Sequence, residues 1–215
     1  MEDRIILVDK PAGITSFGVV ARVRRQLRDE FGHKVKVGHT GTLDPFATGL
    51  LILLSGKMTK KSGEFLKLDK VYEATVKLGY VSSTGDPEGE ITERNDRCPE
   101  ISEVEKVVNS FVGNISQKVP KFSAIKIDGK RAYQLARKGE EFETPTREVE
   151  IYEIEILDYK YPEIDIRCHV SSGTYIRTLG EDIGEKLGTG AYLTALRRTK
   201  VGEYDVADAE KLEKN

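Results

Sequence analysis

The chain has 215 residues, of which 38% are hydrophobic and 33% charged, and its formal net charge is −2. This length suffices for one substantial core, and these fractions are ordinary for a soluble globular protein. The longest apolar run has five residues (50–54), whereas a membrane-spanning helix needs about 20. The N-terminus lacks the apolar region of a signal peptide, and Cys98 and Cys168 lie in no disulfide-scaffold spacing. We therefore expect a cytoplasmic protein with no membrane segment.

The small net charge hides an uneven distribution along the chain. Residues 1–70 carry a net +5 and residues 118–147 a net +4, whereas residues 71–117 and 148–215 carry −5 and −6. A polyanion responds to charges within about one Debye length, about 8 Å at physiological salt, rather than to the total. The two basic segments could therefore form one face for a nucleic acid, although ordinary solvated charges explain the same distribution.

The first elements are predicted to be a strand, a helix and a second strand. Ile5–Val8 favours a short buried strand that Pro11 ends. Thr15 or Ser16 can cap the helix that follows, and Leu50–Leu54 is predicted to be a strand buried on both faces. The helix has an apolar face formed by Val19, Val20, Val23, Leu27 and Phe31, and a basic face formed by Arg22, Arg24, Arg25 and Arg28.

In the middle of the chain, Val71–Gly79 alternates in polarity, which predicts a strand with Tyr72 on its apolar side. The segment 83–90 (STGDPEGE) is predicted to be a turn or exposed loop because of its Gly-Asp-Pro and its acidity. Ser102 and Glu105 form a capping-box pattern, which predicts that a helix opens there.

In the last part of the chain, an Asp-Gly turn at 128–129 is followed by a predicted short basic helix, Lys130–Lys138. The stretches 147–159 and 163–170 are predicted to pair as a hairpin, and a helix should follow Thr174. Because no repeat or linker is visible, the predicted fold class is α+β, with a mixed, mainly antiparallel central sheet flanked by helices and loops.

Several kinds of chemistry find no support in the sequence. His33, His39 and His169 and the two cysteines have no metal-ligand spacing. The segment SGKMT (55–59) lacks the first glycine of a phosphate-binding P-loop, and neither a GxSxG elbow nor a nucleophilic cysteine context is present. What remains is carboxylate chemistry without a metal or a cofactor.

One carboxylate, Asp44, lies in the Gly/Thr-rich segment GHTGTLDPFATG (38–49). An aspartate before proline in such a loop is most often a turn former. Arg177 is predicted in the first turn of a helix, where a cation opposes the macrodipole at a cost of about 0.3–1 kcal/mol. Such an arginine is expected to be held by an acidic side chain or a phosphate, or else to face solvent. Tyr72 is either a core tyrosine or a surface on which a flipped base stacks.

Together, these residues lie in segments that resemble the TruB family of tRNA pseudouridine synthases. GHTGTLDPFATG is similar to the catalytic motif of that family, and its form is similar to that of bacterial members. Four further segments match in order over nearly the whole chain: DKPAGITSF (9–17), KVYEATVKLG (70–79), VPKFSAIKIDGKRAYQLARKG (119–139) and SSGTYIRTLGEDIGEKLGTGAYLTALRRTKVGEY (171–204). The resemblance implies the pseudouridine synthase fold, with a catalytic cleft.

The resemblance also implies a role for each matching residue. Asp44 would be the nucleophile that attacks the target uridine, at C1′ or at C6. Arg177 would pair with Asp44 and keep it ionised, because an arginine stays charged. Tyr72 would stack on the flipped uracil and take part in the C5 proton step, and His39 would support the loop and contact RNA. The other matching positions are the pocket residues Tyr175 and Leu196 and the loop-bracing residues Lys10 and Pro11.

The implied reaction converts uridine to pseudouridine at position 55 in the T-loop of tRNA, after the base is flipped at a cost of about a few kcal/mol. The basic runs Arg22–Arg28 and Lys118–Lys138 are then candidates for phosphate contacts on the T-arm. No metal or cofactor is implied, and a monomer is expected.

Family members usually continue into a small RNA-binding PUA-type domain. Only nine residues follow Val206, so we expect residues 1–215 to form a single catalytic domain without it.

Two other functions remain open at this point. A non-catalytic tRNA-binding and folding chaperone is the main alternative, whereas a glycosidase-like hydrolase lacks a second acid in a comparable setting.

Overall fold

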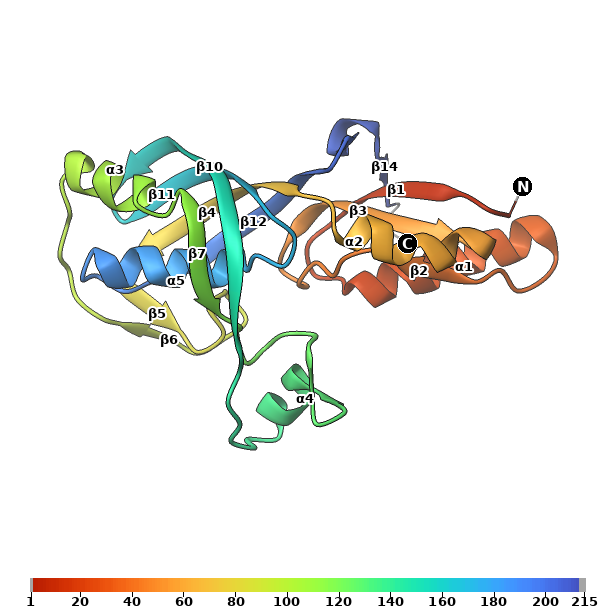
Figure 1. Ribbon diagram of the computed structural model, residues 1–215, viewed down its shortest axis with the longest axis horizontal. Helices are drawn as coiled ribbons and strands as arrows, with labels where there is room; N and C mark the ends of the chain where they lie inside the picture. Colours follow the sequence, from red (N-terminus) through yellow and green to blue (C-terminus); the bar gives the residue numbers. More distant parts are fainter. Residues whose placement is uncertain (1, 213–215) are drawn as a thin grey trace. The chain divides into compact units, whose positions relative to one another are not determined.

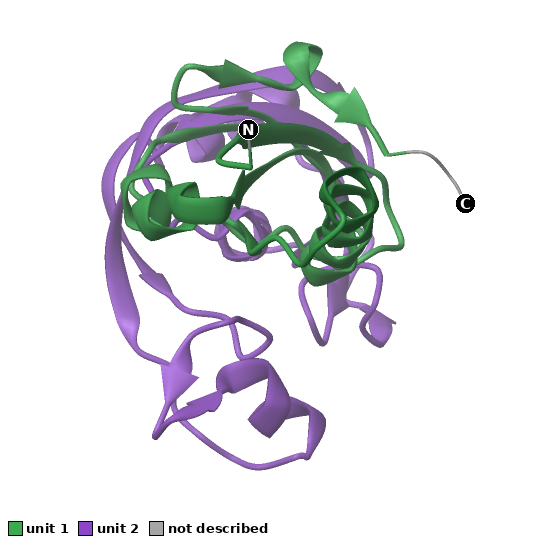
Figure 2. Ribbon diagram, turned by 90° about the vertical axis from the view of Figure 1, so that its right-hand side faces the viewer, with its two compact units in different colours: residues 1–73, 196–215 green, residues 74–195 purple. Residues whose placement is uncertain are grey.

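The computed structural model describes residues 2–212, and the chain forms two compact units (Figure 2). Unit 1 comprises residues 1–73 and 196–215, and unit 2 comprises residues 74–195. Strand β4 (Lys70–Leu78) and strand β12 (Ala191–Val201) each begin in one unit and end in the other. The chain therefore passes between the units inside these two strands.

Unit 1 is built around strand β3 (Thr48–Ser55), in which residues 50–54 are all completely buried, as predicted. β3 pairs antiparallel with β1 (Ile5–Lys10) and β2 (Val37–His39), and parallel with β12. β1 also pairs parallel with β14 (Glu210–Lys211), and β12 pairs antiparallel with β13 (Tyr204–Asp205). The predicted mixed, mainly antiparallel sheet is therefore confirmed in unit 1. Three short helical segments complete it: η1 (Gly56–Lys61), α2 (Ser62–Leu66) and η2 (Val206–Asp208).

Helix α1 (Ser16–Phe31) packs beside β2. Of its predicted apolar face, Val19, Val20, Val23 and Leu27 are buried, whereas Phe31 is only half-buried. The N-cap is Thr15, whose Oγ1 accepts a hydrogen bond of 2.9 Å from the amide of Gly18. The helix ends at Gly32, which has a left-handed conformation with φ of 77°. Because Thr15 is the cap, the hydroxyl of Ser16 is left for a different partner.

Unit 2 contains a sheet in the order β4, β11 (Glu163–Val170), β10 (Thr146–Lys160), β7 (Gly113–Lys118). β10 and β11 form the predicted hairpin, and β10 also pairs antiparallel with β7. Helix α5 (Ile176–Lys186) contacts β7 and helix α3 (Ile101–Asn109), as can be followed in Figure 1. A separate small hairpin joins β5 (Tyr80–Ser82) and β6 (Ile91–Glu93).

The predicted start of α3 is wrong. Its N-cap is Glu100 and makes no side-chain capping bond, so Ser102 lies inside the first turn. The carbonyl of Glu100 accepts bonds from the amides of Glu103 (2.9 Å) and Val104 (3.1 Å), which closes the first turn earlier than the capping-box pattern predicts.

The predicted helix over Lys130–Lys138 is also shorter than expected. Asp128 and Gly129 have φ of 49° and 82°, and two such residues make the tight turn that favours a hairpin. Lys130 and Arg131 consequently form β9, paired with β8 (Lys126–Ile127), and helix α4 covers only Ala132–Arg137. This segment projects from the sheet of unit 2 (Figure 1).

Candidate active site

The backbone just before Asp44 is held by the first helix of unit 1. Ser16 is 2% exposed, and its Oγ accepts a hydrogen bond from the amide of Leu43 and donates one to the carbonyl of the same residue, both at 2.8 Å. One hydroxyl thus satisfies both backbone polar groups of the buried Leu43. The position of Leu43, and with it the start of the Asp44 turn, is tied to α1.

The backbone just after Asp44 is held by a buried lysine. The side chain of Lys10 is completely buried, and its Nζ donates to the carbonyls of Pro11 (2.9 Å), Ile14 (2.8 Å) and Pro45 (3.2 Å). The carbonyl of Pro45 also accepts a bond of 2.8 Å from the amide of Gly13. Removing an ammonium group from water is costly unless it is well bonded, and the loop carbonyls provide these bonds. This geometry suits the bracing role that we predict for Lys10 and Pro11.

The two ends of the same loop are joined by Arg198 of β12, which is 3% exposed. Its Nε donates to the carbonyl of Leu50 (2.8 Å), and its Nη2 donates to that of Gly41 (3.2 Å). Gly49 has φ of 102°, and a Cβ there would lie 2.2 Å from the carbonyl oxygen of Arg198. Only glycine therefore fits at position 49, where β3 pairs with Arg198 of β12. These loop-fixing roles of Ser16 and Arg198 are not predicted by any local sequence pattern, although both residues lie in the matched segments.

Asp44 itself is half-buried, and its carbonyl accepts a bond of 3.1 Å from the amide of Ala47. Its backbone therefore forms the turn that its local sequence favours. Three other predicted site residues also belong to unit 1: Tyr72 is 8% exposed on the apolar side of β4, Leu196 is 7% exposed on β12, and His39 ends β2.

Arg177 belongs to unit 2 and is the second residue of α5, as predicted. Its side chain is 4% exposed, and Nη1 lies 3.3 Å from Oδ2 of Asp86. Nη1 also donates to the carbonyl of Thr84 (2.8 Å), and Nη2 donates to that of Phe122 (2.6 Å). The predicted partner of this arginine was an acidic side chain or a phosphate, and the fold provides the acidic side chain of Asp86.

Asp86 is a residue that sequence reasoning missed, because the segment 83–90 was expected to be exposed. The segment does form turns, but Asp86 is 3% exposed. Its Oδ1 accepts bonds from Thr84 Oγ1 (2.6 Å) and the amide of Glu88 (3.0 Å). No local pattern marks this aspartate, since its partner Arg177 is distant in sequence. Removing one partner of a buried ion pair costs about 3–5 kcal/mol, so the pair fixes the guanidinium.

A second acid, Glu181, follows Arg177 by one helical turn on α5. It packs against Gly85, where a Cβ would lie 2.8 Å from the Glu181 Oε1. Burial raises the pKa of the Glu181 carboxyl to about 7, with Arg177 opposing this increase and Asp182 and Asp86 adding to it. The surroundings of Arg177 therefore include a carboxyl that titrates near neutral pH.

Tyr175, the N-cap residue of α5, is fixed through its backbone by Gln117. The side chain of Gln117 accepts a bond from the amide of Tyr175 (3.0 Å) and donates one to its carbonyl (3.2 Å). Gln117 is 1% exposed. Tyr175 and Arg177 are thus both held at the start of α5 by unit 2.

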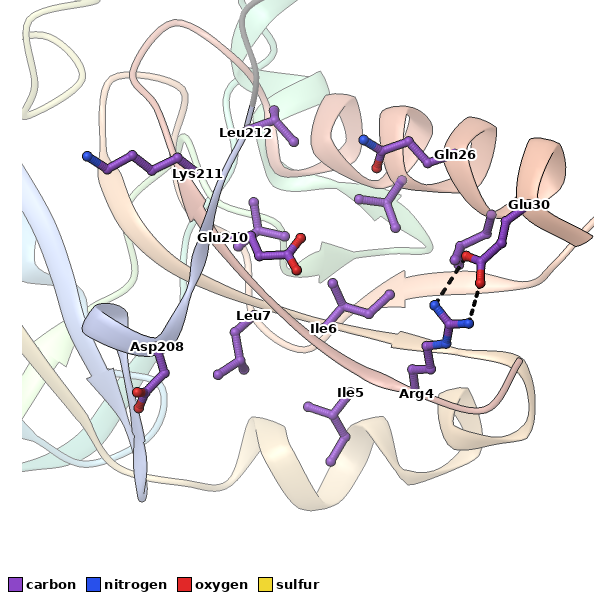
Figure 3. A pocket seen from close by; sticks show the side chains of 13 residues that line it. Arg4, Ile5, Ile6, Leu7, Gln26, Glu30, Asp208, Glu210, Lys211 and Leu212 are labelled. Atoms are coloured by element: carbon purple, nitrogen blue, oxygen red, sulfur yellow. Dashed lines mark hydrogen bonds and ion pairs between the residues drawn. The ribbon is translucent and has the colours of Figure 1, made fainter. Parts of the chain in front are cut away.

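A hollow of unit 1, about 530 Å³ in volume, lies between β1, α1 and residues 208–212 (Figure 3). The ion pair between Arg4 and Glu30 closes one side, with Nη2 and Oε1 2.5 Å apart. None of the predicted site residues lines it. In residues 2–212 no helix is long and apolar enough to cross a membrane, and no group of His, Cys, Asp and Glu side chains has a metal-binding arrangement.

Comparison with known proteins identifies the family. The model of the TruB family pseudouridylate synthase N-terminal domain matches residues 27–176, and that of the tRNA pseudouridylate synthase B C-terminal domain matches residues 177–214. The tRNA pseudouridine synthase B of Azoarcus sp. (strain BH72) is 46% identical over 98% of this chain and 69% of its own length. The protein of the same name from Phocaeicola vulgatus is 46% identical over 99% and 91%, and that from Desulfotalea psychrophila is 49% identical over 95% and 84%.

Solved structures agree with this assignment. The chain superposes on one from a Cbf5–Nop10–Gar1 complex with a TM-score of 0.73 and 30% identity, and on one from an H/ACA RNP bound to a substrate RNA containing 2′-deoxyuridine with 0.71 and 28%. It is covered to 98% in both cases, but it spans only 52% and 51% of those chains. The chain belongs to the TruB family of tRNA pseudouridine synthases.

Proposed function

We propose that this chain converts uridine to pseudouridine at position 55 in the T-loop of tRNA, with Asp44 as the nucleophile. Family membership supports the reaction and the class of RNA. The choice of Asp44 rests on one observation, that the backbone is fixed on both sides of this residue. Ser16 holds Leu43, and Lys10 and Gly13 hold Pro45. A loop that is already ordered presents its carboxylate in one place, so little ordering entropy is lost when the substrate binds.

The proposed reaction is an isomerisation in which atoms and electrons balance within the substrate. The N1–C1′ bond breaks, the base rotates, and a C5–C1′ bond forms. C5 loses a proton and N1 gains one, so no oxidant or reductant is consumed. Attack of the Asp44 carboxylate on C1′ and attack on C6 both satisfy this balance.

The other site residues have proposed roles around this step. Arg177 favours the ionised form of Asp44, because its guanidinium stays charged at every physiological pH. Tyr72 stacks on the flipped uracil and takes part in the C5 proton step, and His39 contacts the RNA beside the loop. Tyr175 and Leu196 line the base pocket. We also propose that the two units act as one catalytic domain over residues 1–215, and that the protein is a monomer.

The first test measures tritium release from T-arm RNA that carries [5-³H]uridine. We expect the wild type to release tritium, and Asp44→Asn to be at least about 10³-fold slower, because an amide is a poor nucleophile. Asp96→Asn, at an exposed aspartate, is the matched control and should react like the wild type. Equal rates for Asp44→Asn and the wild type would remove Asp44 as the nucleophile.

A second arm of the experiment tests the target and the alternative functions. An RNA in which uridine 55 is replaced by cytidine should release no tritium from that position, and release from other positions would contradict the assignment to position 55. If the wild type forms no pseudouridine but speeds the refolding of unmodified tRNA, the chaperone function is correct instead. Free uracil as the product would indicate a hydrolase.

A further inference from the structure

Helix α1 has an exposed side that the proposed chemistry does not use. Phe17, Ala21, Arg24, Arg25 and Arg28 are all exposed and recur at spacings that place them along one side of the helix. Phe17 is 63% exposed, more than any other large hydrophobic residue among residues 2–212. An exposed aromatic ring at one end of a basic stripe can contact a base and phosphates together.

This side of α1 borders a groove of about 640 Å³ in unit 1. The opposite wall is the segment that leads into β2. The residues that line the groove are Ala21, Arg24, Arg25, Arg28, Lys34, Val35 and Lys36. Five of these side chains are cationic and none is acidic, so the groove attracts anions even though the whole chain has a net charge of −2. We call these lining residues together with Phe17 the α1 strip.

Two of the arginines already have contacts of their own. The Nη2 of Arg24 donates to the carbonyl of Val37 (2.6 Å), and its guanidinium lies 5.5 Å from the ring centre of Phe17. Arg28 pairs with Asp29 at 3.0 Å, but both side chains are more than half exposed, so this pair contributes little to stability and is easily exchanged.

The other three cations of the groove are more available. Within residues 2–212, the side chains of Arg25, Lys34 and Lys36 have neither a hydrogen-bond partner nor an ion-pair partner, and all three residues are exposed. Uncompensated like charges gathered in one groove repel one another, and a bound polyanion relieves that repulsion.

The α1 strip begins at the catalytic loop. Phe17 directly follows Ser16, whose hydroxyl is bonded to Leu43, the neighbour of Asp44. From Ser16 to Arg28 the helix rises by about 18 Å, which is long enough to follow several nucleotides. All of these residues belong to unit 1. A strand of RNA that places a uridine at Asp44 can therefore continue along α1.

We propose that the α1 strip is a second RNA-contact surface of this enzyme. In this proposal, Phe17 stacks on an unpaired base next to the flipped uridine, and Arg25, Arg28, Lys34 and Lys36 bind phosphates of the strand that leads away from it. The proposal rests on the proposed function, since it assumes that RNA reaches Asp44. Its chemistry is that of sequence-tolerant strand binding, with cations for the backbone and an aromatic ring for a base.

The cationic part is tested with a triple variant, Arg25→Gln/Lys34→Gln/Lys36→Gln. The matched control removes three exposed cations of unit 2, as Lys106→Gln/Lys160→Gln/Arg167→Gln. KM and kcat for T-arm RNA and the salt dependence of its Kd are measured for both. We expect the α1 variant to raise KM at least about tenfold and to reduce the slope of log Kd against log salt by about 2, with kcat unchanged.

The α1 proposal is overturned if the triple variant has the KM and the salt slope of the control. Its failure can be told from failure of the proposed function. A wild type that binds T-arm RNA without forming pseudouridine contradicts the function alone, and the Kd measurements still decide whether the strip contacts RNA.

The aromatic part is tested with Phe17→Ala and Phe17→Trp. Loss of one stacked base is worth about 1–3 kcal/mol, which corresponds to a Kd raised about five- to hundredfold for Phe17→Ala. Phe17→Trp retains a stacking surface and should bind like the wild type. Because Phe17 is largely exposed, both variants should fold, which circular dichroism checks. Wild-type affinity of Phe17→Ala would overturn the base contact.

Discussion

Among single residues, the two neighbours of Asp44 in the chain are both held by hydrogen bonds to their backbone. Ser16 holds Leu43, and Lys10 holds Pro45, so the two residues that flank the aspartate are each fixed by a buried side chain. A shift of about 1 Å in a reacting group can reduce a rate by about 100-fold. We therefore expect the residues that fix this loop to affect turnover without touching the substrate.

Ser16→Ala tests this expectation, because it removes both bonds to Leu43 and leaves two buried backbone groups unpaired. We expect kcat to fall by about 10- to 100-fold with KM nearly unchanged, and stability to fall by about 1–3 kcal/mol. The control is Thr15→Ala, which removes the N-cap bond to Gly18 and should cost about 1 kcal/mol. Kinetics with T-arm RNA and urea unfolding measure both. An equal loss of kcat in the two variants would show that only stability matters.

Arg177→Met tests the role of the buried guanidinium. We expect the RNA Kd to change by less than about threefold, whereas single-turnover pseudouridine formation is lost, since the proposed role is to keep Asp44 ionised. Met also leaves the buried Asp86 without its ion-pair partner, so stability should fall by about 3–5 kcal/mol. Asp86→Asn provides the comparison, because it keeps the arginine but removes the paired charge. Turnover at the wild-type rate in Arg177→Met would show that the guanidinium is not needed.

At the scale of elements, the start of α5 gathers several groups that depend on one another. The helix presents Arg177 and, one turn later, Glu181, whereas the turn 83–90 brings Asp86 and Gly85 against them. Burial raises the pKa of the Glu181 carboxyl to about 7 from its ordinary value of 4.5. The folded protein therefore binds a proton that the unfolded chain releases between these two pH values.

This difference gives a pH dependence of stability with a definite sign. The contribution of Glu181 is fully present below about pH 4.5 and is lost as the pH rises to about 7. Glu181→Gln is neutral at every pH, so its stability relative to the wild type should increase by on the order of 2–3 kcal/mol between pH 4.5 and 8. The pKa of Asp182 is also raised by burial, and its contribution should remain in the variant. Parallel urea-unfolding profiles for the two proteins would contradict this assignment.

At the scale of the whole molecule, the distribution of charge matters more than its sum. The net charge is −2, yet residues 1–70 and 118–147 carry +5 and +4. If these segments bind about four to six phosphates of tRNA, raising KCl from 0.05 to 0.2 M should weaken binding by about 50- to 2,000-fold in Kd. Fluorescence titration of labelled tRNA measures this. A Kd that hardly depends on salt would mean that neither basic segment contacts the backbone.

Local patterns in the sequence predict most of the secondary structure, and the motifs identify the family. Alternation placed Tyr72 on the buried side of β4, and the continuous apolar run at 50–54 gave a strand buried on both faces. These periodic patterns act locally, so they can be recognised without the fold. The predicted starts of two helices were wrong. The start of α3 depends on the carbonyl of Glu100, and the start of α4 depends on the turn at Asp128.

The polar groups that support the site can be identified only in the folded protein. From sequence alone, Thr15 and Ser16 were equal candidates for a helix cap. In the fold, Thr15 caps the helix and Ser16 bonds to Leu43, 27 residues away. Asp86 was expected in an exposed turn, but it is buried against Arg177. The physical reason is the same in each case. A hydroxyl or a carboxylate has no periodicity that reveals its partner, and its partner is set by burial, which forces every polar group to find one.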